Sequence, residues 1–367
     1  GLNHGAPYAD ICSLEGKELV RDLGLMEFRG MRGWVDSASG GFTSFEEEED
    51  TRFVTGADNE MSNLASSLLA SSTSNTPITT RYSSMIRSLS HIPSPTSPNG
   101  QRWQLHDKSG TTLGSADYLI IAGSGIAHPR WTDTFGGDPP LVAAAAKNKG
   151  NDAILDNALA SIARQKSDPI LAVFFYCTGD AATKWRELGF QIGKLRNTNN
   201  HDGPHEVLSK IIIQPHEEDG GCAVVLHSTA EFARANTGVF GSTSSAARVG
   251  DASSDSSRED ILIAQMLQAL SAIPGYPTVD TTMTADGASY GPLLHRWGNA
   301  FPVGDPLARD LTVCPISRVG FCGDYTETEA RMGSVEAALL SGTSIGERIA
   351  RLAKRDRDGG AEDGMDG

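Results

Sequence analysis

The sequence lacks long apolar runs, paired cysteines and an excess of basic residues. No stretch approaches the roughly 18 consecutive apolar residues that a membrane-spanning helix needs. The five cysteines are scattered and none has C-x-x-C spacing, which argues against a zinc site or a disulfide framework and for a soluble protein of a reducing compartment, cytoplasm or organelle. With a net charge of −15, nucleic acid is not an expected partner.

What is present is the composition of an ordinary globular protein. The 367 residues include 39% hydrophobic and 21% charged side chains, which is enough for about two domains with real cores. Part of the acidic excess lies in two runs, Glu46–Asp50 and Glu362–Asp366. Residue 1 is glycine, so we expect the numbered chain to be a fragment of a longer product, and any targeting segment to lie outside it.

Strand-like and helix-like segments alternate along the chain. The continuous apolar run Tyr118–Ala122 is typical of a strand buried on both faces in a parallel sheet, and the pattern favours one long strand over 112–122. Further strands are expected at Ile170–Cys177, Ile211–Ile213, Cys222–Ser228 and His295–Phe301. The interleaving indicates an α/β (α+β) protein, with a nucleotide-binding domain and a second domain on a mixed or antiparallel sheet.

The richest stretch lies near the end of the sequence. Arg318–Asp324 is interpreted as a short buried strand followed by a turn, and a helix is expected from about Ser334 to Leu352. The first amides of a helix are unpaired and its dipole favours negative charge there, so a nucleotide or an electron-rich ring can bind. The spacing of apolar residues predicts a buried helix face that includes Gly342 and Gly346. At these glycines the helix backbone could approach a sheet or a ligand closely. The alternative is a core helix packed tightly on a sheet, with no ligand.

Asp324 follows the strand and Gly323 directly. An aspartate in that position can accept hydrogen bonds from the hydroxyls of a sugar or a ribityl chain. The structural alternative is an aspartate that caps a helix or closes a turn, which is common.

Four segments, in order and with rough spacing, resemble the renalase-like FAD-dependent oxidoreductases, especially the plant and algal flavoproteins of that group. They are the "HGAPY" segment at 4–8, "VLHSTAEF" at 225–232, "HRWGNAFP" at 295–302, and "CGD" at 322–324 with "GSVEAA" at 333–338 and "SG" at 341–342. The last segment is shared by many flavoprotein oxidases, and the set of four is more specific. The resemblance runs from about residue 3 to residue 352.

The resemblance implies a Rossmann-like FAD-binding domain and a mixed-sheet substrate domain. It assigns 1–70, 78–135 and 310–353 to the FAD-binding domain and mainly 136–309 to the substrate domain. A disordered insertion is expected at 236–257, from its Ser, Gly and Ala content, and a disordered tail at 354–367. By resemblance the FAD-binding residues are Gly323, Asp324, Gly333, Ser334, Val335 and, from a backbone that reads adenine, Ile86.

Three residues are candidates for the substrate pocket: His227, Arg296 and Trp297. Each has a structural alternative, which is a satisfied sheet histidine for His227, an ion-pair partner for Arg296 and a core aromatic for Trp297. No side chain is expected to act as a nucleophile and no metal is expected, because the flavin itself carries the chemistry.

The sequence departs from the family at its start. The family opens with a βαβ unit carrying G-x-G-x-x-G, and this unit is absent here. Gly123-Ser124-Gly125 follows a strand but lacks the third glycine, so it does not replace that unit.

The expected function is hydride transfer from a small reduced substrate to FAD, followed by reoxidation by O₂ or another acceptor. The resemblance does not choose among dihydronicotinamides, amines and other donors. There are two alternatives. One is an amine-oxidase-like flavoenzyme, and the other is a truncated, non-catalytic nucleotide-binding or interaction protein.

Overall fold

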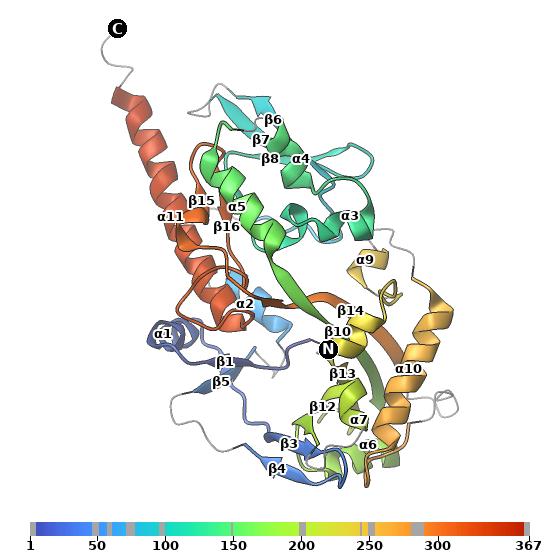
Figure 1. Ribbon diagram of the computed structural model, residues 1–367. Coiled ribbons are helices and arrows are strands. Elements are labelled where there is room, and N and C mark those ends of the chain that lie inside the picture. Colours follow the sequence, from blue (N-terminus) through green and yellow to red (C-terminus); the bar gives the residue numbers. More distant parts are fainter. Residues whose placement is uncertain are drawn as a thin grey trace. The chain divides into compact units, whose positions relative to one another are not determined.

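The computed structural model describes residues 5–45, 51–56, 61–70, 78–94, 100–147, 150–197, 203–242, 244–248, 254–279 and 290–362. The chain forms two compact units, whose elements are labelled in Figure 1. Unit 1 consists of Gly1–Cys12, Lys17–Thr76 and Asp168–Phe301, and unit 2 of Ser13–Gly16, Pro77–Ser167 and Pro302–Gly367.

A seven-stranded mixed sheet forms the centre of unit 1. Its strand order is β14 (Tyr290–Val303), β10 (Lys166–Cys177), β13 (Cys222–Ser228), β12 (Leu208–Pro215), β11 (Ile192–Arg196), β3 (Arg32–Asp36) and β4 (Phe42–Ser44). All seven residues of β13 are buried, which is the pattern of a central strand covered on both faces. Strands β3 and β11 pair in parallel, whereas β10 with β13, β13 with β12, β12 with β11 and β3 with β4 pair antiparallel.

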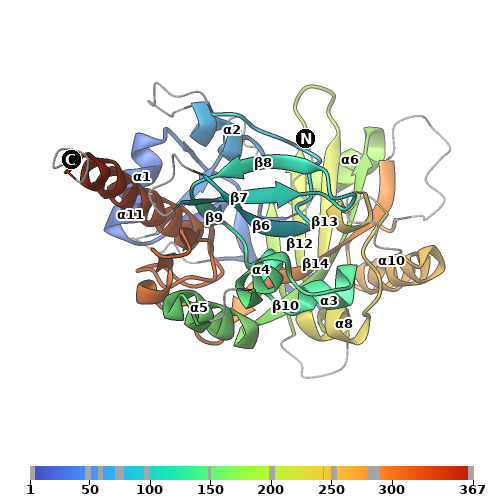
Figure 2. The same ribbon diagram turned by 90° about the horizontal axis from the view of Figure 1, so that it is seen from above.

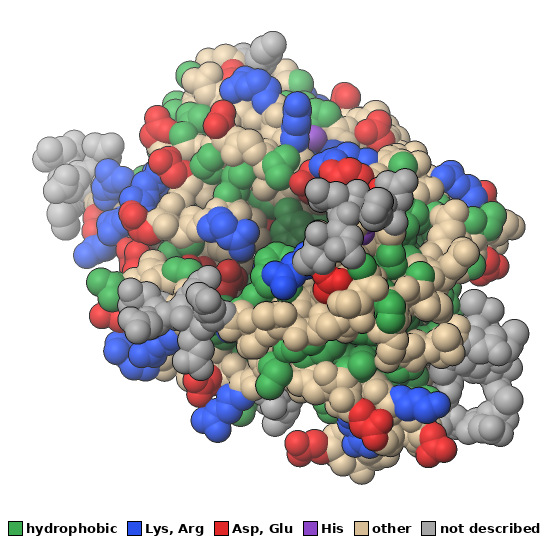
Figure 3. All heavy atoms as spheres, turned by 60° about the horizontal axis from the view of Figure 1, so that its bottom comes forward, with side chains coloured by type: hydrophobic (Ala, Val, Ile, Leu, Met, Phe, Trp, Pro, Cys, Tyr) green, Lys and Arg blue, Asp and Glu red, His purple; other side chains and the backbone are tan. Residues whose placement is uncertain are grey.

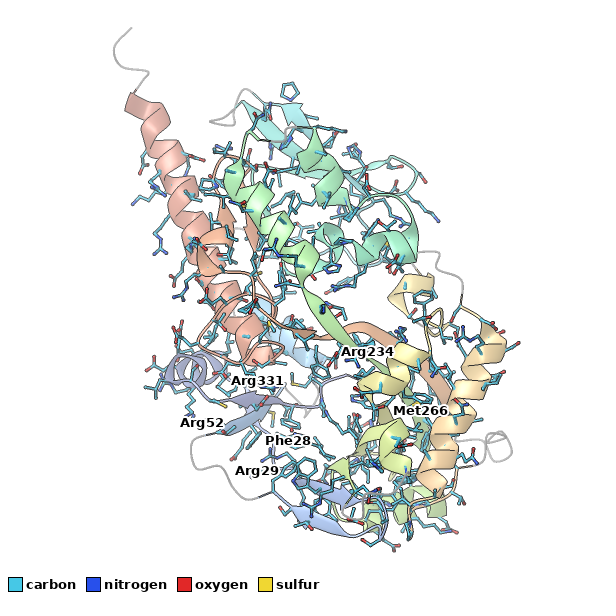
Figure 4. The ribbon with its side chains drawn as sticks, in the orientation of Figure 1. Phe28, Arg29, Arg52, Arg234, Met266 and Arg331 are labelled. Carbon is cyan, nitrogen blue, oxygen red and sulfur yellow. The ribbon has the colours of Figure 1, made fainter. Side chains whose placement is uncertain are left out.

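Helices cover one face of this sheet and close the core of unit 1. They are α6 (Gly179–Glu187), α7 (Pro204–Val207), α8 (Ala230–Ala235) and α10 (Ser256–Ser271). Met266 of α10 is fully buried in a cluster with Leu226 and Phe175 of the sheet, and Figure 4 labels it. The short helices α2 (Asn63–Ala70) and α9 (Ser245–Arg248) also belong to this unit.

A second, small sheet in unit 1 has the order β1 (Ala9–Ile11), β5 (Arg52–Thr55) and β2 (Met26–Glu27). Aromatic rings gather beside it, with Tyr8 stacked on Phe28 at 5.1 Å between centroids. Figure 4 labels Phe28 and Arg52 in this region. The guanidinium of Arg32 lies 3.2 Å above the centroid of the Phe53 ring and 5.4 Å from that of Tyr8.

Unit 2 holds two three-stranded sheets. One is antiparallel, with the order β6 (Ser88–Pro93), β7 (Gln101–His106) and β8 (Thr112–Ala116), and it lies beside α4 (Pro140–Ala146) in Figure 2. The other has the order β15 (Val313–Cys314), β16 (Val319–Phe321) and β9 (Leu119–Ile121). Unit 2 also contains the helical segments η2 (Ser124–Ala127), α3 (Arg130–Phe135), α5 (Ala153–Arg164), η3 (Arg309–Leu311) and α11 (Val335–Glu362). Helix α1 (Leu14–Asp22) begins in unit 2 and ends in unit 1.

The predicted fold class is confirmed, since the protein is a mixed α/β structure with several sheets. The strands expected at Ile170–Cys177 and Cys222–Ser228 are present, and the apolar run near Tyr118 forms β9, which pairs in parallel with β16 as expected. The single strand predicted over 112–122 is wrong. It divides at Asp117 and Tyr118 into β8 and β9, which belong to different sheets.

The two units are divided differently from the predicted domains. The N-terminal strand β3 pairs with β11, so residues 17–70 belong with the mixed sheet and not with the segment around Gly323. Residues 136–167 and 302–309 belong with unit 2, because α5 packs against β15 and Leu307 pairs with Thr326. Both changes depend on contacts between segments far apart in the sequence.

The described part of the predicted insertion 236–257 has structure. Val239 is fully buried, and Ser244 is 3% exposed. The backbone amide of Gly241 donates to Glu259 Oε1 at 3.2 Å, which ties this segment to α10. Disorder is therefore the wrong description for these residues.

The predicted tail 354–367 is also helical over its described residues, since α11 continues to Glu362. The physical reason lies at Asp356. Its carboxylate accepts a hydrogen bond from Arg318 Nη2 at 2.8 Å and another from the Tyr118 hydroxyl. This network holds α11 against the strands beyond the end of its apolar stripe.

The buried face of α11 agrees only in part with the predicted one, because Ile345 and Ile349 are buried as their apolar spacing predicts but Gly342 and Gly346 are not. Ala337, Leu340, Ser341, Ile345 and Ile349 are buried, whereas a Cβ atom added to Gly342 or Gly346 would meet nothing within 4 Å. The close approach is made by a glycine of the strand. A Cβ atom on Gly320 would lie 3.0 Å from the Ile345 side chain.

Four of the five cysteines are buried, as their apolar surroundings predict, and Cys12 is exposed. Burial raises the pKa of Cys177 to about 11 and that of Cys222 and Cys314 to about 12.

Because the thiolate is the reactive form, we expect one thiol per chain to react rapidly with Ellman's reagent in the folded protein and all five to react in guanidinium chloride. The Cys12→Ser variant should lose the rapid phase; a rapid phase of two or more thiols would contradict this prediction.

The helices within the described residues include none long and apolar enough to cross a bilayer. On the face seen in Figure 3, acidic and basic side chains are interspersed and do not form a surface of one sign.

Candidate functional site

Two parallel strands of unit 2 end at the same edge of their sheet. Gly320 of β16 is in register with Ile120 of β9, and the backbone amide of Cys322 donates to Ile121 O at 3.0 Å. Each strand continues into a turn that contains glycine, Gly123 after β9 and Gly323 after β16. In open α/β sheets, ligands bind outside the carboxyl ends of parallel strands, which makes this edge the candidate site.

Gly323 has a conformation that other residues rarely adopt. Its φ is +127°, and an added Cβ atom would lie 2.9 Å from both Ala122 O and Tyr325 Cε1. Its amide donates to Ser341 Oγ at 2.9 Å. The position of this turn therefore depends on the absence of a side chain at residue 323 and on the Ser341 hydroxyl of α11.

The start of α11 lies at the same place. The backbone amide of Gly333, where φ is +81°, donates to Asp324 O at 2.8 Å. Ser334 Oγ accepts a hydrogen bond from the Ala337 amide at 3.0 Å, which is the contact of a helix N-cap. Val335 is the first residue of the helix. The structure thus brings together five of the predicted cofactor residues: Gly323, Asp324, Gly333, Ser334 and Val335.

The Asp324 side chain is half-buried, and burial raises the pKa of its carboxyl group above the usual value. Within the described residues, no hydrogen bond or ion pair joins this carboxyl to another side chain. A carboxylate in this situation loses hydration and gains only a hydrogen bond from its own backbone amide, so a ligand hydroxyl that donates to it would be favoured.

Glu336, in the first turn of α11, was not predicted to matter. It is 2% exposed, and its Oε1 atom accepts hydrogen bonds from the amide and the hydroxyl of Ser13 at 2.9 and 2.6 Å. The sequence offered one signal for the role of Glu336. It is an acidic residue two positions after the expected helix start, within the "GSVEAA" segment. Its partner lies 323 residues away and could not be inferred.

A cation lies beside the β9 turn. Arg130 Nη2 donates to Ser124 Oγ at 3.0 Å, and Nη1 donates to Ser167 Oγ at 3.4 Å. Burial lowers the pKa of this guanidinium. In the same segment His128 Nδ1 accepts the Arg130 amide at 3.0 Å, which orders the turn after β9. The sequence analysis did not single out Arg130, which directly follows Pro129.

Ile86 lies in the irregular segment before β6 and packs against the core cluster of unit 2 that includes Ile121 and Tyr325. Neither Gly323 nor the start of α11 is a member of this cluster. Its assignment to the adenine site therefore stays a prediction.

The three predicted substrate residues belong to unit 1. His227 is 3% exposed on β13, opposite Ala172 on one side and Lys210 on the other. Arg296 Nη1 donates to Ala233 O at 2.9 Å and to Asn236 O at 2.8 Å, and thus closes the carboxyl end of α8. This role is structural, although it involves backbone carbonyls and not the expected ion pair.

Trp297 is 37% exposed, so it is not a core aromatic. Its ring lies 4.6 Å from that of His295, and a Cβ atom on Gly5 would lie 3.3 Å from Trp297 Cζ2. Two of the segments that carry the family resemblance, at 4–8 and 295–302, therefore meet at this ring. Across the described residues, no three His, Cys, Asp or Glu side chains are placed to hold a metal ion.

No protein-family model and no curated protein matches this sequence. Among solved structures, cyclohexylamine oxidase from Brevibacterium oxydans IH-35A is similar at 16% identity and a TM-score of 0.39, over 74% of this chain and 49% of that one. Wild-type putrescine oxidase bound to putrescine is similar at 13% identity and a TM-score of 0.41, over 93% and 87%.

An oxidoreductase from Methanosarcina mazei is similar at 12% identity and a TM-score of 0.42, over 81% of this chain and 56% of that one. The chain thus spans about half the length of the cyclohexylamine oxidase and of the Methanosarcina protein. At these identities and TM-scores, the similarities by themselves establish neither a shared fold nor a shared activity.

Proposed function

We propose that the protein is an FAD-dependent oxidoreductase, in which unit 2 binds the cofactor and unit 1 supplies the sheet that binds a small reduced substrate. One observation carries the proposal. The carboxyl ends of β9 and β16, the backbone of Asp324 and the start of α11 converge on one edge. The resemblance to renalase-like flavoproteins, read from four sequence segments, supports the same assignment.

The residues at this edge fit the cofactor by their chemistry. The Asp324 carboxyl can accept hydrogen bonds from ribityl or ribose hydroxyls. Among the described residues, no side chain donates a hydrogen bond to this carboxyl. Gly323 and Gly333, both at positive φ, give the chain between β16 and α11 a backbone conformation that residues with a side chain rarely adopt. The first amides of α11, from Val335 onward, favour negative charge on a bound ring.

When bound, FAD would supply two-electron redox chemistry between a small hydride donor and O₂ or another acceptor. The side chains at the edge therefore need only bind and orient. We propose a dihydronicotinamide or a similar small hydride donor as the substrate, because the resemblance to renalase-like enzymes points to that class.

The first test is the visible spectrum of the protein expressed from its complete reading frame. We expect bound flavin bands, which a reduced nicotinamide bleaches without oxygen. A protein that stays colourless after incubation with FAD would overturn the proposal. Bleaching by an amine but not by a reduced nicotinamide would replace the proposed substrate and make the protein amine-oxidase-like.

The Asp324→Ala variant is expected to bind FAD roughly 10- to 100-fold more weakly, because a hydrogen bond to a charged group is lost. Equilibrium dialysis against FAD measures this change. The matched control is Asp310→Ala, which removes an exposed carboxylate from η3 in the same unit. Equal affinities of the two variants would show that Asp324 only shapes the turn.

A further inference from the structure

A groove in unit 2 runs beside the carboxyl-terminal half of α11 and has a volume of about 910 Å³. Helix α11 packs against β15, and β15 packs against α5 (Figure 1). The groove is lined by side chains of these three elements, of η3 and of Pro315. Four of the lining side chains are cationic, two are carboxylates and four are apolar. Its volume lies in the range of about 300–1,000 Å³ that is usual for ligand sites.

The wall of the groove that α11 supplies is a row of cations. Arg348, Arg351 and Arg355 follow the i, i+3, i+7 spacing of one helix face, and Lys354 lies next to them. At a rise of about 1.5 Å per residue, the row extends for about 10 Å along the helix axis. The groove therefore presents several positive charges in a line, in a chain whose net charge is −15.

The carboxylates nearby do not neutralise this row. Arg351 Nη1 lies 3.9 Å from Glu347 Oε2, and both side chains are mostly exposed, so this ion pair is weak. The two carboxylates of the groove itself belong to Asp310 and Asp358. Within the described residues, no carboxylate forms an ion pair with the other three cations of the row, Arg348, Lys354 and Arg355.

Arg348 is the least exposed cation of the row. Its Nη1 atom donates to Arg309 O at 3.0 Å and also to the Thr312 hydroxyl, which fixes the guanidinium at the edge of the groove. Burial lowers the pKa of this guanidinium, and the charges of Arg309 and Arg351 lower it further, whereas Asp310 raises it. An anion in the groove would offset this crowding of like charges.

Apolar side chains remain accessible beside the cations. Ile154, in the first turn of α5, is 36% exposed, and Pro315 is exposed after β15. Leu352 is half-buried between Arg348 and Arg355 on α11. Val313 is 5% exposed and already covered, so it adds little surface. A ligand in the groove can therefore bury apolar surface on Ile154, Pro315 and Leu352 while its charges meet the row.

We propose that this groove binds an acidic segment of a partner protein, with carboxylates along the row of cations and an apolar side chain on Ile154, Pro315 and Leu352. Side chains on one face of an extended segment are about 7 Å apart, so two or three acidic residues match a row of about 10 Å. A ligand with a single anionic group would leave most of the row unmatched.

The groove is separate from the proposed flavin site and does not depend on it. Arg348 lies 13 residues after Val335, the first residue of α11, which places it about 20 Å along the helix from the edge around Gly323. Peptide binding by a protein that never takes up flavin would therefore overturn the proposed function and leave this proposal standing.

Fluorescence anisotropy with labelled peptides and the full chain tests the proposal. The first peptide alternates glutamate and leucine, the second alternates lysine and leucine, and the third alternates glutamate and serine. We expect the first to bind at least about tenfold more tightly than the second, with an affinity that falls as salt is raised, and about threefold or more tightly than the third. If the first peptide bound no better than the other two, the row would be an ordinary solvated helix face and the proposal would be wrong.

Two arginines of α11 provide a matched pair of variants. Arg355 lines the groove, whereas Arg357, also exposed and two residues further along, does not. Arg355→Gln is expected to weaken the glutamate–leucine peptide about three- to tenfold, and Arg357→Gln to leave it unchanged. Ile154→Ser should weaken this peptide but not the glutamate–serine peptide. Equal losses in the two arginine variants would contradict the proposal. Binding to phosphatidylserine vesicles without binding to the peptide would replace the protein partner by a membrane surface.

Discussion

Replacing Gly323 with valine is expected to destabilise unit 2 by about 3 kcal/mol or more. Gly323 has a φ of +127°, where a β-branched residue is strained. Its Cβ atom would lie 2.9 Å from Ala122 O, a backbone atom that cannot move aside without disturbing β9. The loss should appear as a lower urea midpoint with an unchanged m-value, because stability and not the exposed surface has changed.

The control is a glycine of the same unit in an ordinary conformation. Gly342 lies inside α11, and a Cβ atom there would meet nothing within 4 Å. Gly342→Ala is therefore expected to be neutral or to stabilise the protein by up to about 1 kcal/mol, because alanine favours the helix. If both variants unfolded at the same urea concentration, the strain assigned to Gly323 would be absent.

The Asp356→Ala variant is expected to have a free energy of unfolding about 2–3 kcal/mol lower than that of the unchanged protein. This loss is smaller than that for a fully buried ion pair, because the carboxylate is partly exposed. The Arg318 side chain is 5% exposed and that of Asp356 32%. The mutation removes the carboxylate that accepts from both Arg318 and the Tyr118 hydroxyl. Thermal and urea unfolding measure the loss.

A second measurement separates this network from a general weakening of the helix. Burial raises the pKa of Tyr118 to about 12, and the Asp356 hydrogen bond adds to that effect. The pKa of Tyr118 should therefore fall in Asp356→Ala, as followed by tyrosinate absorbance. Asp358→Ala, an exposed change of the same charge on the same helix, should leave both the stability and this titration unchanged.

Local patterns predicted those parts of the fold that depend on neighbouring residues. The run Cys222–Ser228 is a strand because seven successive side chains are buried, and such a run is visible in the sequence. The convergence of Asp324, Gly333 and Val335 was also predictable, since they lie within a dozen residues and are joined by a strand, a turn and a helix start.

Contacts across long sequence distances could not be predicted. The pairing of Trp34 with Lys194 spans 160 residues and decides that residues 17–70 belong with the mixed sheet. Asp356 lies beyond the apolar stripe of α11, and only Arg318 and Tyr118 explain why the helix continues past it. Arg296 carries a charge in a family-like segment, yet its partners are two backbone carbonyls, which no sequence pattern reveals.

The parallel pairing of β3 with β11 also affects how the chain folds during synthesis. At about 5–20 residues per second, a ribosome needs roughly 10–30 s to extend the chain from Asp36 to Ile192. During that time β3 has emerged without its parallel partner, while the intervening segment of unit 2 is being made. Such a strand exposes an unpaired edge, so the folding yield in cells should depend on chaperones and on the rate of translation between these two strands.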